Sequence, residues 1–144
     1  MQLTITQFEF GERPQVTMPT PMLLSLLKEQ GIRKLVSDHY DLLRISKVGN
    51  LFPTDDDQFE IAKSSSADFF IQILGGPSYF NQNRGQPRLP DRHAPFAITL
   101  EARNIWLDCY RNVLLKLDLP EDVIMSFWNY INVFSIKMVN TPGS

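Results

Sequence analysis

The amino-acid sequence predicts an all-α fold, and three observations support this prediction. Apolar side chains recur every three or four residues in several long segments, which is the spacing of amphipathic helices. Glycine and proline residues lie between these segments, where helices end. No segment reads as a convincing strand with a second strand to pair with. At 144 residues the chain is long enough for one domain with a sizeable core.

The composition excludes several classes of protein. A net charge of −2 gives no basic surface for nucleic acid, so we expect no nucleic-acid partner. No apolar run approaches the roughly 20 residues that a membrane helix needs, and the N-terminus lacks a signal-peptide pattern. The single cysteine excludes an internal disulfide and a Cys-x-x-Cys metal site. We therefore expect a cytoplasmic protein with no membrane partner.

The N-terminal residues 1–20 are predicted to form an extension or arm, followed by the folded domain over residues 21–142. The arm carries scattered apolar residues and ends in three prolines, Pro14, Pro19 and Pro21. Two arrangements are open: an extended or partly disordered segment on the chain's own domain, or an arm that packs on a second subunit.

Two helices are predicted at the start of the domain. The first is short, from Pro21 to about Gln30, with Gly31 as its stop. The second runs from Ile32 to about Ser46. One face of the second helix is expected to point inward, and it consists of Ile32, Leu35, Val36, His39, Tyr40 and Leu43.

A longer helix is predicted from the Thr54–Asp57 segment to Leu74, where Gly75-Gly76-Pro77 ends it. Acidic residues at its start cap free backbone amides and suit the positive end of the helix dipole. Its inner face begins with small side chains, which leave room for something beside the helix, and becomes bulky later: Ala62, Ser66, Phe69, Phe70 and Ile73.

The following loop, residues 77–98, holds four prolines, so we expect no regular structure beyond a turn or two around residues 88–93. A loop of this length inside a compact domain usually has a function. Two clear helices complete the chain, one capped by Thr99 and one opened by Pro120.

A series of short motifs surrounds this loop. They are Phe69-Phe70, Gly75-Gly76-Pro77, Arg84-Gly85, Pro87-Arg88-Leu89, Arg92-His93-Ala94-Pro95-Phe96 and Trp106-Leu107. Their order and spacing resemble the group II truncated haemoglobins, over about residues 24–142. The resemblance implies a truncated globin domain over residues 21–142, with a two-over-two helical sandwich around haem b.

The resemblance makes His93 the ligand of the haem iron. An imidazole in this role is neutral and has its second nitrogen held by a backbone carbonyl or a similar acceptor. Arg88 and Arg92 can meet the haem propionates, because guanidinium groups form forked contacts with carboxylates. Apolar walls for the porphyrin come from Phe69, Phe70, Phe96 and Ile98.

On the opposite, distal side the resemblance places Tyr40 and Trp106 as hydrogen-bond donors to a bound gas. It places Ala62 and Ser66 over the haem and Phe52 at an aromatic corner. At three further positions the chain departs from the family: His39 precedes the distal tyrosine where the family usually has Phe, Ser65 replaces a basic residue near the propionates, and Phe80 replaces a tyrosine. His39 is the other imidazole of the chain, with distal iron ligation or a buried structural role as alternatives.

The resemblance implies a haem protein that binds dioxygen, carbon monoxide and nitric oxide. A polar distal pocket retains the gas, which favours capture or redox chemistry over bulk transport. Nitric oxide detoxification by a dioxygenase activity and a peroxidase-like activity both remain open, with electrons from a separate reductase. The alternatives are a haem-based gas sensor that acts through a partner protein and a haem-free helical interaction module. The oligomeric state is expected to be a monomer or a homodimer.

Overall fold

The computed structural model describes residues 1–143, and they form only helices, turns and extended segments. The predicted all-α fold is therefore confirmed. The helices are α1 (Met22–Arg44), η1 (Gly49–Leu51), α2 (Asp56–Ile73), α3 (Tyr79–Arg84), α4 (Leu89–His93), α5 (Leu100–Leu114), α6 (Glu121–Phe134) and η2 (Ser135–Met138). Among the described residues, none of these helices combines the length and the apolar character that crossing a membrane requires. The chain divides into two compact units, residues 20–87 and residues 1–19 with 88–144.

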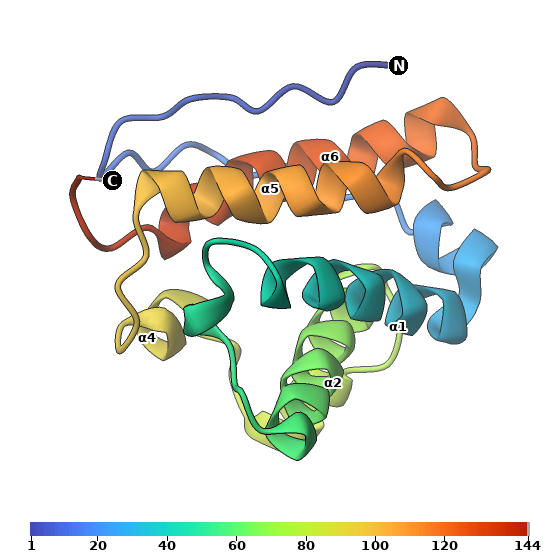
Figure 1. Cartoon of the computed structure of the whole chain (residues 1–144). Coiled ribbons are helices and arrows are strands. Elements are labelled where there is room, and N and C mark those ends of the chain that lie inside the picture. The colour runs from blue at the N-terminus through green and yellow to red at the C-terminus, as the bar shows by residue number, and fades with distance from the viewer. Residues whose placement is uncertain (144) are drawn as a thin grey trace. The chain divides into compact units, whose positions relative to one another are not determined.

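In the unit of residues 20–87, α1 packs against α2 and α2 against α3 (Figure 1). The inward face predicted for the helix that starts at Ile32, which is the second part of α1, is confirmed: Ile32, Leu35, Val36, His39 and Leu43 are buried and Tyr40 is half-buried.

The predicted helix stop at Gly31 is wrong. The break lies three residues earlier, at Lys28, whose φ of 63° and ψ of 174° are not helical. Gly31 lies inside the helix, where a Cβ atom would approach Leu27 Cβ to 2.7 Å. The glycine is therefore explained by close packing against the preceding turn, and not by a C-terminal cap.

Both ends of α2 form as their residues predict. Asp55 is the N-cap, and its carboxylate accepts a hydrogen bond of 2.9 Å from the backbone N–H of Gln58. At the other end Gly75 adopts a φ of 95°, which a residue with a Cβ rarely adopts. A Cβ on Gly76 would lie 2.9 Å from the carbonyl oxygen of Ile71, so the second glycine permits close packing.

Helix α3 was not predicted from the sequence, and a buried ion-pair network holds it in place. Asp68 of α2, which is only 4% exposed, lies 2.8 Å from Arg84 of α3 and 2.8 Å from Arg33 of α1. Burial alone would raise the pKa of Asp68, but the hydrogen bonds from Arg84 and Arg33 outweigh it and hold the pKa below its usual value. One carboxylate thus ties three helices together.

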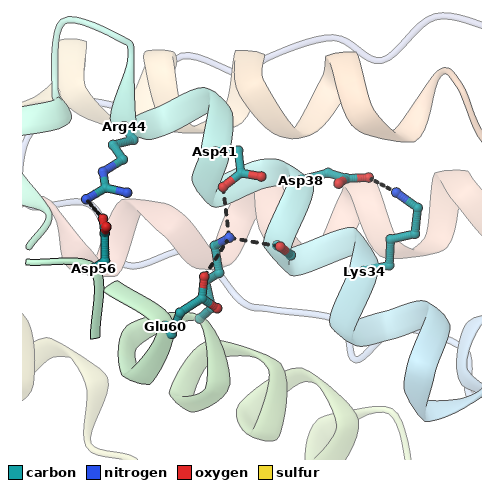
Figure 2. A network of polar contacts seen from close by, with 8 residues as sticks. Lys34, Asp38, Asp41, Arg44, Asp56 and Glu60 are labelled. Atoms are coloured by element: carbon teal, nitrogen blue, oxygen red, sulfur yellow. Dashed lines mark hydrogen bonds and ion pairs between the residues drawn. The ribbon is translucent and has the colours of Figure 1, made fainter. Parts of the chain in front are cut away.

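A second polar network joins α1 and α2 (Figure 2). Lys63 Nζ lies 2.8 Å from Asp41, and Arg44 pairs with Asp56 at 2.8 Å. Lys63 also contacts Ser37 and Glu60. The buried ring of Phe59 meets both cations, with Arg44 Cζ 4.2 Å and Lys63 Nζ 5.0 Å from its centre. These contacts hold the Phe59 ring beside the ring of Tyr40.

In the other unit, α5 and α6 run side by side (Figure 1). The predicted cap of α5 is present, since Thr99 Oγ1 accepts a hydrogen bond of 3.1 Å from the N–H of Ala102. The core between the two helices is strongly apolar and includes Leu107, Tyr110, Leu114, Ile124, Phe127, Trp128 and Ile131. After α6, η2 packs against α4 and α5.

The N-terminal arm is extended and follows α5 and α6 of its own chain (Figure 1). Side chains of these helices bind its backbone: Trp128 Nε1 donates to the Thr4 carbonyl at 3.0 Å, and Arg111 donates to the Leu3 carbonyl at 3.0 Å. Thr6 N–H donates to Asn132 Oδ1 at 2.9 Å. Arg103, only 2% exposed, donates to the Thr6 carbonyl at 2.9 Å.

Candidate functional site

His93 is the last residue of α4, and its ring is half-buried. Its Nδ1 atom lies 2.7 Å from the carbonyl oxygen of Leu89, one turn earlier in the same helix. A carbonyl oxygen only accepts hydrogen bonds, so Nδ1 carries a proton, and in the neutral ring Nε2 then has the lone pair. This is the tautomer and the backbone clamp that a metal-binding imidazole requires.

The two arginines beside His93 lie at the surface. Arg88 is the N-cap of α4 and adopts a left-handed conformation with a φ of 40°. Its side chain is 74% exposed and lies 3.5 Å from Asp91, an ion pair that contributes little at this exposure. Arg92 is also exposed. Both guanidinium groups are therefore accessible to an anionic group such as a propionate.

The loop after His93 carries Phe96 and Ile98, two of the apolar residues predicted to line the porphyrin. Phe96 is 46% exposed and Ile98 is half-buried. This loop is fastened by Asn140, whose amide nitrogen donates to the carbonyl oxygens of His93 and Phe96. Asn140 could not be identified from the sequence, because it lies 47 residues from His93 and no local motif marks an asparagine that binds a distant backbone.

Trp106 lies on α5 and is half-buried. Its ring meets the fully buried ring of Tyr110 edge to face, with 5.0 Å between the ring centres. Cys109 on the same helix is 8% exposed, and burial raises the pKa of its thiol. A protonated, buried thiol is a poor nucleophile, so Cys109 is structural.

In the unit of residues 20–87, the structure brings together three of the predicted distal residues. The ring of Tyr40 meets Phe52 at 5.4 Å between centres, and its hydroxyl shares a hydrogen bond with Ser66 of α2. Burial raises the pKa of Tyr40, and the hydrogen bond with Ser66 offsets only part of this effect. The hydroxyl therefore remains a proton donor at neutral and moderately alkaline pH.

The remaining residues singled out in this unit lie along α2 and α3. Ala62 and Ser65 are half-buried and lie four residues and one residue before Ser66, respectively. Phe69 and Phe80 are buried, with their rings 6.0 Å apart and nearly perpendicular. This pair joins α2 to α3 through an aromatic contact.

His39, the second imidazole, is fully buried on α1 and lies edge-on to Tyr40 at 6.1 Å. Among residues 1–143 no three His, Cys, Asp or Glu side chains gather into a metal-binding cluster. Within the unit that holds His93, the clamped ring, the accessible Arg88 and Arg92 and the apolar Phe96 and Ile98 fit a metal centre that needs a single protein ligand, as haem iron does.

Comparisons with known proteins agree with this fit. A bacterial-like globin family model matches residues 27–140. The chain is 31% identical over 90 residues to the group 2 truncated hemoglobin YjbI of Bacillus subtilis, covering 62% of this chain and 66% of that protein. It is 33% identical over 81 residues to two-on-two hemoglobin-3 of Arabidopsis thaliana, covering 54% of this chain and 46% of that protein. The matched segment thus spans about half to two thirds of these relatives' length.

Solved structures show the same relationship. The phosphate-bound crystal structure of Hell's gate globin IV matches with a TM-score of 0.88 and 35% identity, covering 96% of this chain and 87% of that one. The truncated oxygen-avid haemoglobin from Bacillus subtilis matches with a TM-score of 0.76 and 25% identity, covering 84% and 99%. The predicted resemblance to group II truncated haemoglobins is therefore confirmed, and with it the truncated globin fold. This chain belongs to the bacterial-like globin family, whose members bind gases through haem.

Proposed function

We propose that the chain binds haem b through Nε2 of His93 and uses it to hold dioxygen, carbon monoxide and nitric oxide. The observation that carries this proposal is the 2.7 Å contact between His93 Nδ1 and the Leu89 carbonyl, which leaves Nε2 as the iron-binding atom. Haem supplies a ferrous iron that takes up a diatomic gas. The protein supplies the ligand, the apolar surroundings and the hydrogen-bond donors.

The other contacts to haem are assigned by chemical type. Arg88 and Arg92 are the partners of the propionates, because both guanidinium groups are accessible. The apolar and small side chains proposed to contact the porphyrin are Phe52, Ala62, Ser65, Ser66, Phe69, Phe80, Phe96, Ile98 and Trp106.

Tyr40 and Trp106 are proposed as the donors to the gas. The Tyr40 hydroxyl stays protonated because its pKa is raised, and an indole N–H can only donate. Two such hydrogen bonds, at about 1–1.5 kcal/mol each, slow escape of the gas by roughly one hundredfold. A protein that retains its gas so strongly suits capture or redox chemistry better than transport.

The redox reaction proposed is detoxification of nitric oxide. The haem held by His93 would supply the one electron with which dioxygen and nitric oxide give nitrate, and a separate reductase or small reductant would replace that electron. The test is the nitrate yield after nitric oxide is added to the oxygenated protein. One nitrate per haem supports this reaction, and release of dioxygen without nitrate contradicts it.

A haem-based gas sensor that acts through a partner protein is the second candidate. It is favoured by the N-terminal arm, because α5 binds the arm through Arg103 and Arg111 and also carries Trp106. Deleting residues 1–8 separates the two candidates. A sensor requires the deletion to change gas release or association state, whereas a capture enzyme keeps both unchanged.

The first experiment is an absorption spectrum of the purified chain in its ferric and ferrous forms. A strong Soret band that shifts with carbon monoxide supports gas binding through haem. A chain that takes up no haem from solution behaves as a haem-free interaction module, and the proposal is then wrong.

A further inference from the structure

We infer that Asn140 is a positioning residue for His93, which it holds by fastening the loop of residues 93–98 to the end of η2. The inference rests on the proposed function, since it gives Asn140 its effect through the iron ligand. The attachment of the loop to residues 140–141 does not depend on the proposed function, because it is made by hydrogen bonds within one unit.

The side-chain amide of Asn140 uses its whole hydrogen-bonding capacity. Its Nδ2 donates to the His93 carbonyl at 3.2 Å and to the Phe96 carbonyl at 2.9 Å. Its Oδ1 accepts from the Ile98 N–H at 3.0 Å and from Thr141 Oγ1 at 2.8 Å. An amide has two N–H donors and two oxygen lone pairs, so each is occupied. An exposed asparagine that served only for solvation would not be paired in this way.

The backbone completes the junction. The N–H groups of Asn140 and Thr141 both donate to the Ile98 carbonyl, each at 3.0 Å. Both backbone polar groups of Ile98 are therefore bound to residues 140–141. The loop is anchored at its first residue, His93, through its carbonyl, and at its last residue, Ile98, through both groups.

The anchor matters because α4 is too short to fix His93 by itself. The helix has five residues, and its N-cap, Arg88, adopts a left-handed conformation that is unfavourable for a residue with a side chain. Its main packing contact is with η2, the element that Asn140 follows. The orientation of the His93 ring therefore depends on two contacts: that of its Nδ1 with the Leu89 carbonyl, and that of its backbone carbonyl with the Asn140 amide.

The geometry requires an amide and not merely a polar side chain. A carboxylate of the same size keeps the oxygen acceptors but loses both donors, and it would face the His93 and Phe96 carbonyl oxygens with negative charge. Asn140→Asp should therefore loosen the loop at least as much as Asn140→Ala. The matched control is Asn112→Asp, because Asn112 of α5 also donates its amide to a carbonyl, that of Asp108 at 3.0 Å, away from the loop.

The experiment compares full-length Asn140→Asp, Asn140→Ala and Asn112→Asp with the wild-type protein. Amide hydrogen exchange at Ile98 should accelerate about tenfold in both Asn140 variants and stay unchanged in the control, as for loss of one or two hydrogen bonds. In the haem-loaded proteins, transfer of haem to an excess of a haem-accepting apoprotein should accelerate about tenfold. The iron–imidazole stretching band in the ferrous Raman spectrum should broaden or shift.

Unchanged Ile98 exchange and haem transfer within twofold of wild type in both Asn140 variants would overturn the inference. So would faster exchange with an unmoved iron–imidazole band and unmoved haem transfer, since Asn140 would then be structural only. Failure of the proposed function has a different signature, namely normal haem content after His93→Ala. Asn140→Ala also serves as a second variant should the charge of Asp impair folding.

Discussion

The Nδ1 atom of His93 lies 2.7 Å from the carbonyl oxygen of Leu89, four residues earlier in the chain. This contact fixes both the tautomer of the neutral ring and its tilt, because the carbonyl accepts a hydrogen bond that only a protonated Nδ1 can donate. The ring is thereby prepared to offer Nε2 to a metal before any metal arrives. The folding of α4 already orders the His93 side chain. Less conformational entropy is therefore lost when haem binds, which favours tight haem binding.

Replacing Trp106 with Phe should speed oxygen release about tenfold, because the variant keeps an aromatic ring but loses one donor. The contact with the Tyr110 ring is largely retained, so stability should change little. Stopped-flow displacement of oxygen by carbon monoxide measures the rate. An unchanged rate would move the donor role to Tyr40 or Ser66.

Tyr40→Phe should also speed oxygen release about tenfold, for loss of the phenolic donor. Since burial raises the pKa of Tyr40, the contribution of its hydroxyl should persist at about pH 10, where an ordinary tyrosine is half ionised. The measurement is the release rate of both proteins between pH 7 and pH 10. Ser66→Ala is the matched variant, because it removes the hydroxyl bonded to Tyr40 but leaves the phenol in place.

Asp68→Asn should lower the free energy of unfolding by about 2 kcal/mol at neutral pH, for loss of its charged hydrogen bonds to Arg33 and Arg84. The folded pKa of Asp68 lies below the unfolded value of 3.8, so the stabilisation is complete well above that value and is lost as the pH falls through the folded pKa. Urea unfolding from pH 7 down to pH 3 measures the difference between wild type and variant. A difference that stayed constant over this range would contradict the assignment.

Arg103→Met should lower the free energy of unfolding by about 3 kcal/mol, because it leaves buried acceptors unsatisfied. Those acceptors are the carbonyls of Thr6 and Asn132 and the hydroxyl of Ser135. The Thr6 amide, which donates to Asn132, should lose its protection from hydrogen exchange. Arg111→Met is the control: Arg111 also binds the arm, through the Leu3 carbonyl, but it is more exposed and should cost less.

Local chemistry made part of the structure predictable. The caps formed by Asp55 and Thr99 are present as expected, because a cap depends on residues only three positions apart. The inward direction of His39 and Tyr40 followed from helical spacing alone. A carbonyl partner for the imidazole was expected from the chemistry of a neutral histidine ligand.

Features that depend on residues far apart in sequence were missed. Helix α3 is held by Asp68, 16 residues before its partner Arg84, while glycine and proline around it suggested a loop. Asn140 and His93 are 47 residues apart, and Arg103 and Thr6 are 97 apart. The kink at Lys28 was misplaced because Gly31 has the sequence signature of a helix stop, whereas packing against Leu27 is what requires a glycine there.

The most direct test of the central claim is haem binding by the two histidine variants, since the chain has only two histidines. Haem titrations followed at the Soret band should show that His39→Gln binds one haem tightly and that His93→Gly does not. Added imidazole should restore the wild-type ferrous spectrum to His93→Gly, because it can occupy the place of the missing ring. Tight haem binding with an unchanged spectrum in His93→Gly, without imidazole, would contradict ligation by His93.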